Sequence, residues 1–133
     1  MHLDKDDENM LKLLIIGTGG FIGAILRYEI SGWAHRLFGS SFPYGTLTVN
    51  VIGSFLLGVF LVLANTKLII PDAYKNLIAI GFLGAFTTFS TFSYETISLI
   101  EINLMKQAVL NIALNVVFGL MAVWLGAICA KML

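Results

Sequence analysis

The sequence predicts an all-α integral membrane protein with four transmembrane helices. Hydrophobic residues make up 58% of its 133 residues, charged residues make up only 12%, and the mean hydropathy is +0.90. Soluble domains carry about 25% charged residues, so this composition indicates a chain that lies in a lipid bilayer. A membrane-spanning helix needs roughly 20 mostly apolar residues. Four such runs follow one another, at about 11–32, 44–66, 76–100 and 107–130.

The connections between the runs are short and contain both prolines, Pro43 and Pro71. They leave no room for a soluble domain, so we expect a single multi-pass domain over residues 1–133 with a polar tail at 1–10. The tail is acidic, and the apolar run after it is too long for a signal peptide and lacks a small-residue cleavage site. We therefore expect the first helix to remain in the protein. Because the formal net charge is zero, no basic surface for nucleic acid is expected.

The first run contains two small residues four positions apart, Gly19 and Gly23, and Arg27 and Glu29 lie near its end. Small residues at this spacing allow two helices to approach closely. Further examples are Ser54 with Gly58 in the second run, and Ala122, Gly126 and Ala130 in the fourth. Packing within one subunit and packing between two subunits explain these positions equally well.

The second and fourth runs each carry a narrow polar face. The residues that recur every four positions are Thr46, Asn50, Ser54 and Gly58 in the second run, and Asn111, Asn115 and Gly119 in the fourth. Polar side chains in a bilayer usually face the interior of the bundle or a cavity. A hydrogen bond between helices would explain any one asparagine. Two such faces beside a hydroxyl-rich third run favour a lined pathway.

The residue types of these faces indicate what a pathway would carry. Asparagine offers two N–H donors, each hydroxyl offers one, and an aromatic ring has a positive edge. The rings of acidic residues that line many cation channels are missing from this sequence. The lining therefore suits a small anion. Four helices pack around a filled core, so a transport path would need a second copy of the chain.

The third run contains a stretch, GAFTTFSTFSYE at 84–95, with many hydroxyls in an apolar context. Gly81, Gly84 and the threonines that follow make this run a plausible place for a helix to unwind, which a membrane tolerates only where the backbone is buried or lines a cavity. Exposed carbonyls there could bind a cation. Phe89 and Phe92 would then lie on one side of the following half-helix. From the pattern alone, core phenylalanines with threonines bonded to carbonyls four residues earlier are the simpler interpretation.

The stretch at 84–95 closely resembles the third-helix signature of the Fluc (CrcB) fluoride channel family. YGTLTVNVIGSFLLG at 44–58 and GGFIGAILRY at 19–28 are similar to the family's second-helix and first-helix motifs, and their order and spacing match across nearly the whole chain. The resemblance implies a channel and not an enzyme. It implies an antiparallel, dual-topology homodimer in the cell membrane that passes fluoride out of the cytoplasm down its electrochemical gradient through two pores.

The resemblance also implies roles for individual residues. The fluoride path would include Asn50, the ring edges of Phe89 and Phe92, and the hydroxyls of Ser90 and Thr91. Asn111 and Asn115 would be further members of the path, on weaker grounds because the fourth helix varies in the family. Arg27, Thr48 and Glu95 match other motif positions. The backbone carbonyls of Gly84 and Thr87 match the ligands of a structural Na⁺ ion that is not transported.

Two other functions are compatible with a short four-helix chain. A small proton-coupled cation or multidrug antiporter would need a titratable acid near the middle of the first helix, whereas the only acid of that run is Glu29, near its end. An accessory subunit would carry no ion flux of its own. A weak bias of Lys and Arg between the two sides of the membrane, about five to three, permits insertion in both orientations.

Overall fold

The computed structural model describes residues 5–66 and 70–133, and every element in these ranges is helical. The elements are α1 (Lys5–Phe38), α2 (Tyr44–Thr66), α3 (Asp72–Lys75), the π-helix η1 (Asn76–Leu83), α4 (Gly84–Phe86), α5 (Phe89–Glu101) and α6 (Met105–Met132). Four stretches, the third of which joins α3 through α5, are long and apolar enough to cross a membrane. The predicted all-α class with four spans is therefore confirmed.

The first helix is longer than its apolar run at both ends. It begins at Lys5, inside the predicted polar tail, whose residues 1–4 lie outside the described ranges. Three acidic residues occupy its first turn and two basic residues its last turn, which suits the dipole of the helix at each end. It ends where Gly39 takes a φ of +88° and its N–H donates to the His35 carbonyl at 2.9 Å. A glycine with positive φ is a common helix terminator.

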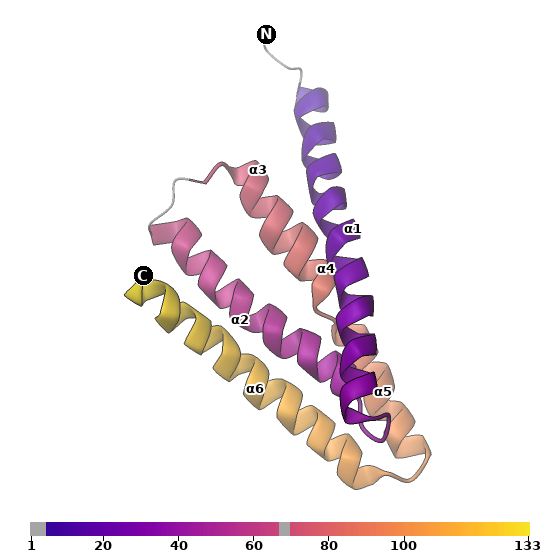
Figure 1. Cartoon of the computed structure of the whole chain (residues 1–133). Helices are drawn as coiled ribbons and strands as arrows, with labels where there is room; N and C mark the ends of the chain where they lie inside the picture. The colour runs from indigo at the N-terminus through magenta and orange to yellow at the C-terminus, as the bar shows by residue number, and fades with distance from the viewer. Residues whose placement is uncertain (1–4, 67–69) are drawn as a thin grey trace.

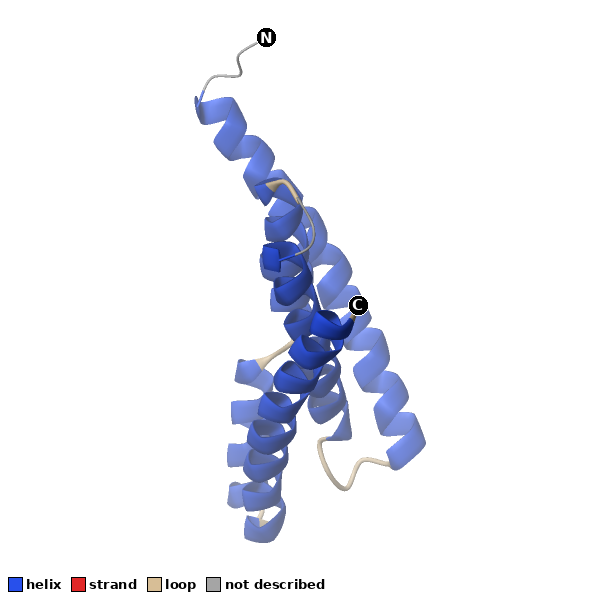
Figure 2. Ribbon diagram, turned by 90° about the vertical axis from the view of Figure 1, so that its left-hand side faces the viewer, coloured by secondary structure: helices blue, strands red, loops and turns tan. Residues whose placement is uncertain are grey.

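The spans run alternately down and up, and they form two neighbouring pairs (Figure 1). The third stretch lies beside α1, and α6 lies beside α2. Turned by 90°, the molecule shows its helices running along its long dimension, with short connections between them (Figure 2). Each connection is too short to cross the molecule, so consecutive spans must be antiparallel.

Glycines bring the backbones of each pair into contact. A Cβ added at Gly23 of α1 would collide with the Phe82 carbonyl of η1, and one added at Gly126 of α6 would collide with the Phe55 carbonyl of α2. Gly58 of α2 lies equally close to the backbone of α6. These small residues therefore pack within the subunit. The sequence left open whether such residues pack within one chain or between two; at these three glycines they pack within one chain.

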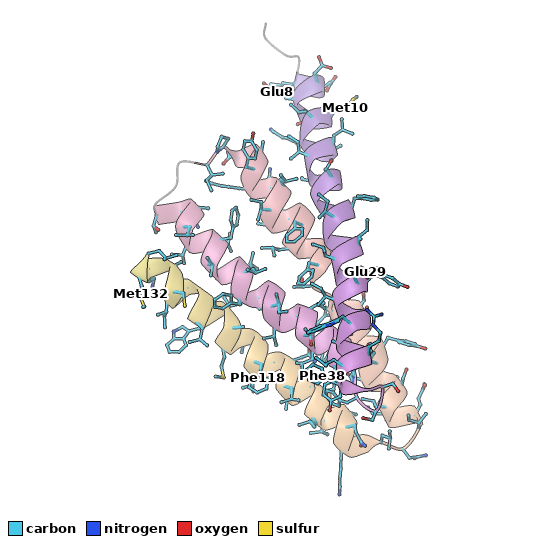
Figure 3. The ribbon with its side chains drawn as sticks, in the orientation of Figure 1. Glu8, Met10, Glu29, Phe38, Phe118 and Met132 are labelled. Atoms are coloured by element: carbon cyan, nitrogen blue, oxygen red, sulfur yellow. The ribbon has the colours of Figure 1, made fainter. Side chains whose placement is uncertain are left out.

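The outer surface carries large apolar side chains in the part of the chain that the structure describes. Figure 3 shows Phe118 and Met132 projecting from α6, and Met10 near the start of α1, above the other helices. Their side chains are 44%, 79% and 62% exposed. Water would disfavour such a surface, whereas the hydrocarbon of a bilayer would not.

The third span is interrupted between α4 and α5. Thr87 and Thr88 leave the helical conformation, with φ/ψ of −84°/160° and −150°/119°. The prediction that this run could unwind is confirmed. The simpler interpretation is confirmed in one part and wrong in another. Thr87 and Thr96 do donate to carbonyls four residues earlier, at 3.0 and 2.8 Å. Phe89, however, does not belong to the core of this chain, because it is 79% exposed.

Candidate ion pathway

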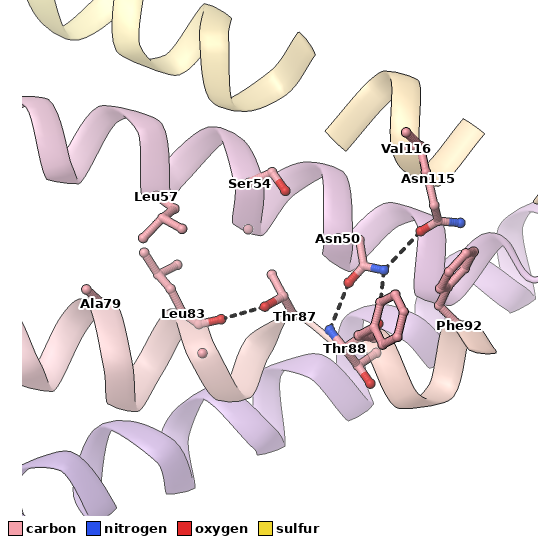
Figure 4. Close-up of a pocket in the computed structure, with 13 residues that line it drawn as sticks. Asn50, Ser54, Leu57, Ala79, Leu83, Thr87, Thr88, Phe92, Asn115 and Val116 are labelled. Atoms are coloured by element: carbon pink, nitrogen blue, oxygen red, sulfur yellow. Dashed lines mark hydrogen bonds between the residues drawn. The ribbon is translucent and has the colours of Figure 1, made fainter. Parts of the chain in front are cut away.

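The interruption of the third span is held by one side chain from α2. The Thr88 N–H donates to Asn50 Oδ1 at 2.8 Å, and Asn50 Nδ2 donates to the Thr88 carbonyl at 3.1 Å (Figure 4). A break in a membrane helix leaves backbone groups that need partners away from water. The carboxamide of Asn50 supplies a partner to both backbone groups of Thr88. Asn50 therefore clamps the break.

Thr88 also starts the helix that follows the break. Its hydroxyl accepts a hydrogen bond from the Thr91 N–H at 3.2 Å and donates to Thr91 Oγ1 at 3.0 Å. This is the usual bond of a residue that caps a helix N-terminus. The Ser90 hydroxyl lies 3.4 Å from the Thr88 hydroxyl. Thr88 was not among the predicted site residues, although a hydroxyl residue directly before a helix is a signal for a helix cap.

A ladder of amides connects the break to α6 and back to α5. Asn50 Nδ2 also donates to Asn115 Oδ1 at 2.9 Å, and Asn115 Nδ2 donates to Asn111 Oδ1 at 2.9 Å. Asn111 is fully buried and donates to the Thr96 hydroxyl at 2.9 Å. Both N–H groups of Asn50 are therefore engaged within the subunit. Whether Asn111 and Asn115 contribute to an ion path stays a prediction.

A cavity of about 330 Å³ lies beside the break, with walls from α2, η1, α4, α5 and α6 (Figure 4). Asn50, Asn115, Phe89 and Phe92 line it, together with Thr88. The two phenyl rings have centroids 5.6 Å apart and planes 53° apart, so they are tilted and not stacked. Both rings border the same cavity, which confirms that they lie on one side of the half-helix.

A second cavity, of about 520 Å³, lies on the other side of Thr88 and is lined by charged residues. Arg27 of α1 and Glu95 of α5, which the motifs singled out, both border it, as does Thr91. Glu95 Oε1 accepts a hydrogen bond from the Thr46 hydroxyl at 2.8 Å. Because Thr88 borders both cavities, the break separates a charged cavity from one lined by amides and aromatic rings.

Three predicted site residues lie outside these cavities. Thr48 is half-buried on α2, Ser90 is exposed in the first turn of α5, and Asn111 is fully buried on α6; none of them lines either of the two cavities beside the break. His35 of α1, by contrast, was not singled out from the sequence and lines the charged cavity. A lone histidine near the end of an apolar run is the signal that could have drawn attention to it.

The break changes the hydrogen bonding of the carbonyl groups before it. In a continuous helix the Thr88 N–H would donate to the Gly84 carbonyl, but here it donates to Asn50. The Thr87 hydroxyl is engaged with the Leu83 carbonyl at 3.0 Å. No group of three or more His, Cys, Asp or Glu side chains in the described ranges could hold a metal ion. The Na⁺ ion that the resemblance implies at this break stays a prediction.

Comparison with known proteins identifies a family over most of the chain. The family described as "CrcB-like protein, Camphor Resistance (CrcB)" matches residues 14–127. A protein of Methanosarcina acetivorans named "Fluoride-specific ion channel FluC 1" is 48% identical over 121 residues, which cover 91% of this chain and 92% of that protein.

Bacterial proteins show the same similarity. The "Fluoride-specific ion channel FluC" of a Sulfurovum species is 50% identical over 91% of this chain and 94% of its own length. The protein of that name from Citrifermentans bemidjiense is 43% identical over 93% of this chain and 100% of its own length. The matched region contains α2, the interrupted third span and both cavities. This chain belongs to the CrcB family.

Proposed function

We propose that this chain is the subunit of a fluoride-specific ion channel of the cell membrane. The names of its similar relatives support this function. The observation that carries it is the interrupted third span, where Asn50 clamps the break beside a cavity lined by Phe89 and Phe92. The protein would let fluoride leave the cytoplasm down its electrochemical gradient and thereby give resistance to fluoride.

The path would run from the charged cavity, past Thr88 and Thr91, to the cavity at Asn50. Fluoride is small, strongly hydrated and accepts hydrogen bonds only, so donors must replace its water. Neutral hydroxyls and amides do this without the deep energy well of a buried Lys or Arg. Since both N–H groups of Asn50 already have partners, a passing ion would replace one of these bonds transiently. The positive edges of Phe89 and Phe92 would face the ion next.

The channel would be an antiparallel homodimer with dual topology. One copy of the chain leaves Phe89, which lines the cavity at the break, 79% exposed. A second copy in the opposite orientation would cover this ring and give a symmetric pair of paths. The weak Lys and Arg bias permits both orientations.

A structural Na⁺ ion would lie where the two breaks meet. Gly84 and Thr87 of each copy would supply backbone carbonyls, and the Gly84 carbonyl has lost its helical donor to Asn50. The ion would hold the two breaks together without being transported. Na⁺ should therefore raise the thermal unfolding temperature of the dimer, and Thr87→Ser, which keeps the carbonyl, should preserve that effect. An unfolding temperature equal in Na⁺ and in a large organic cation would contradict the ion site.

Fluoride efflux from liposomes tests the function directly. Purified protein in vesicles loaded with potassium fluoride should release fluoride when an ionophore lets potassium leave, and vesicles loaded with potassium chloride should retain chloride. Protein-free vesicles give the background leak. Absence of fluoride efflux from vesicles that contain folded protein would overturn the proposal. Uptake of a cationic dye driven by a pH gradient would favour the antiporter instead.

A further inference from the structure

Two buried polar atoms of the described residues have no hydrogen-bond partner in the chain. They are Nδ1 of His35 and Oε2 of Glu95. Leaving a buried donor or acceptor without a partner is costly, so each such atom needs an explanation. Both belong to residues that border the charged cavity. A shared location makes a shared explanation the simplest one.

His35 and Glu95 form part of the wall between two cavities. Besides the charged cavity of about 520 Å³, both border a smaller cavity of about 220 Å³ beside the connection between α1 and α2. The two side chains come from different helices, α1 and α5, so the tertiary packing brings them to the same cavity walls.

Each of the two side chains is held so that one polar atom is left over. The imidazole packs on α2, where a Cβ added at Gly45 would lie 2.9 Å from His35 Nε2. Glu95 is held by the Thr46 hydroxyl through Oε1. The backbone of His35 is fixed by the bond from Gly39 at the end of α1.

The charged groups around His35 and Glu95 determine how protonation of His35 would act on an ion in the cavity. From α1, Arg27, Tyr28, Glu29 and Arg36 border the charged cavity; from α5, Glu95 borders both cavities and Tyr94 the smaller one; α2 contributes only uncharged residues. Neither arginine forms an ion pair with Glu95 in the described part of the chain. A Glu95 carboxylate without a cationic partner would oppose an anion that enters this cavity.

We propose that His35 is a positioning residue of the charged cavity, whose protonated imidazole donates from Nδ1 to Glu95 Oε2, directly or through one water molecule. This bond neutralises the carboxylate and holds it away from the path, and the cavity then admits an anion. The inference rests on the proposed fluoride function. Histidine is the side chain that ordinarily changes charge between roughly pH 5 and 8. Fluoride conduction therefore rises as the pH on both sides of the membrane falls through this range.

The rise is an effect on rate and not a coupling of fluoride to protons. Two unit charges about 4 Å apart in water interact by about 1 kcal/mol, which corresponds to about a fivefold change in rate. We expect a change of this size in the wild type between about pH 5 and 8. His35→Gln keeps an N–H donor but cannot titrate, and Glu95→Gln removes the charge that His35 neutralises. Both variants should show a flat pH profile.

The experiment measures fluoride efflux from liposomes at equal internal and external pH. Rates are divided by the amount of folded protein, and protein-free vesicles at each pH give the leak of hydrogen fluoride through lipid. The matched control is His2→Gln, which replaces the other histidine of the chain, at a position outside the described residues. It should keep the wild-type profile. A wild-type profile that His35→Gln reproduces would overturn the inference.

A second readout does not depend on conduction. In nitrogen-labelled protein at acidic pH, the Nδ1 proton of His35 should show the downfield resonance of a hydrogen bond to a carboxylate, and Glu95→Gln should abolish it. A resonance that Glu95→Gln leaves unchanged would overturn the pairing. If the wild type conducts no fluoride at any pH, the proposed function fails, and the resonance alone then decides whether His35 and Glu95 are paired.

Discussion

Asn50→Asp is the substitution with the clearest expected effect. The side chain keeps its size, and Oδ1 can still accept the Thr88 N–H, which lies at 2.8 Å. It loses the two donor bonds to the Thr88 carbonyl at 3.1 Å and to Asn115 Oδ1 at 2.9 Å. At about 0.5–1.5 kcal/mol for each bond, the free energy of unfolding should fall by about 1–3 kcal/mol. The protein should still fold, because the bond from the Thr88 N–H to Oδ1 remains and continues to hold the break.

The effect of Asn50→Asp on conduction should be much larger than its effect on stability. An ionised carboxylate in this cavity would repel a fluoride ion by about 4 kcal/mol at about 4 Å, in surroundings typical of a protein surface. This would slow passage by roughly three orders of magnitude. Fluoride efflux from liposomes measures the rate, and denaturant unfolding in detergent measures the stability. Efflux at the wild-type rate would remove Asn50 from the ion path.

The matched control is the same change at Asn103. This residue lies in the turn between α5 and α6 with a φ of 61° and is exposed. Asparagine and aspartate both tolerate this conformation. Asn103→Asp should therefore leave efflux unchanged and the free energy of unfolding within about 0.5 kcal/mol of the wild type.

Three further predictions concern the rings, the helix contacts and the orientation. Phe89→Ile and Phe92→Ile should each slow fluoride efflux about threefold to tenfold, because a ring edge is lost, at a stability cost under about 1.5 kcal/mol. If efflux fell only in proportion to the loss of folded protein, the two rings would be packing residues. Gly126→Ala should lower the free energy of unfolding in detergent by about 1–3 kcal/mol, because its Cβ would strike a backbone carbonyl of α2. The control is Gly17→Ala, whose Cβ would meet nothing within 4 Å and which should not destabilise the protein. Ser40→Cys, in a background without the native cysteine, should be labelled from both sides of the membrane; labelling from one side only would exclude the antiparallel pair.

The four spans could be predicted because each depends on a local property of the chain. A run of about 20 apolar residues can satisfy its backbone in a bilayer only as a helix. The exact ends of the helices could not be predicted from hydropathy. The helix α1 runs from Lys5 to Phe38 because charged residues at its ends suit the helix dipole and Gly39 terminates it, whatever the hydropathy of those turns.

The candidate site could be predicted only in part. The resemblance pointed to Asn50, Phe89 and Phe92, and the structure brings all three to one cavity. Local sequence signals could mark Thr88 only as a helix cap; they could not indicate that the Asn50 side chain, 38 positions earlier in the sequence, holds its backbone. A lone histidine near the end of an apolar run could draw attention to His35, but only the packing of the helices places it on the same two cavities as Glu95.

The sequence by itself determined that this chain is a four-span membrane protein with a third span able to unwind. These properties follow from the residue composition of one turn or one span, so they do not depend on contacts with other segments of the chain. Only the tertiary structure decided that the third span opens at Thr87 and Thr88. Taken alone, the Thr88 N–H would bond to the Gly84 carbonyl and continue the helix; the break exists because the Asn50 carboxamide from α2 offers the same backbone groups an equivalent pair of hydrogen bonds away from water.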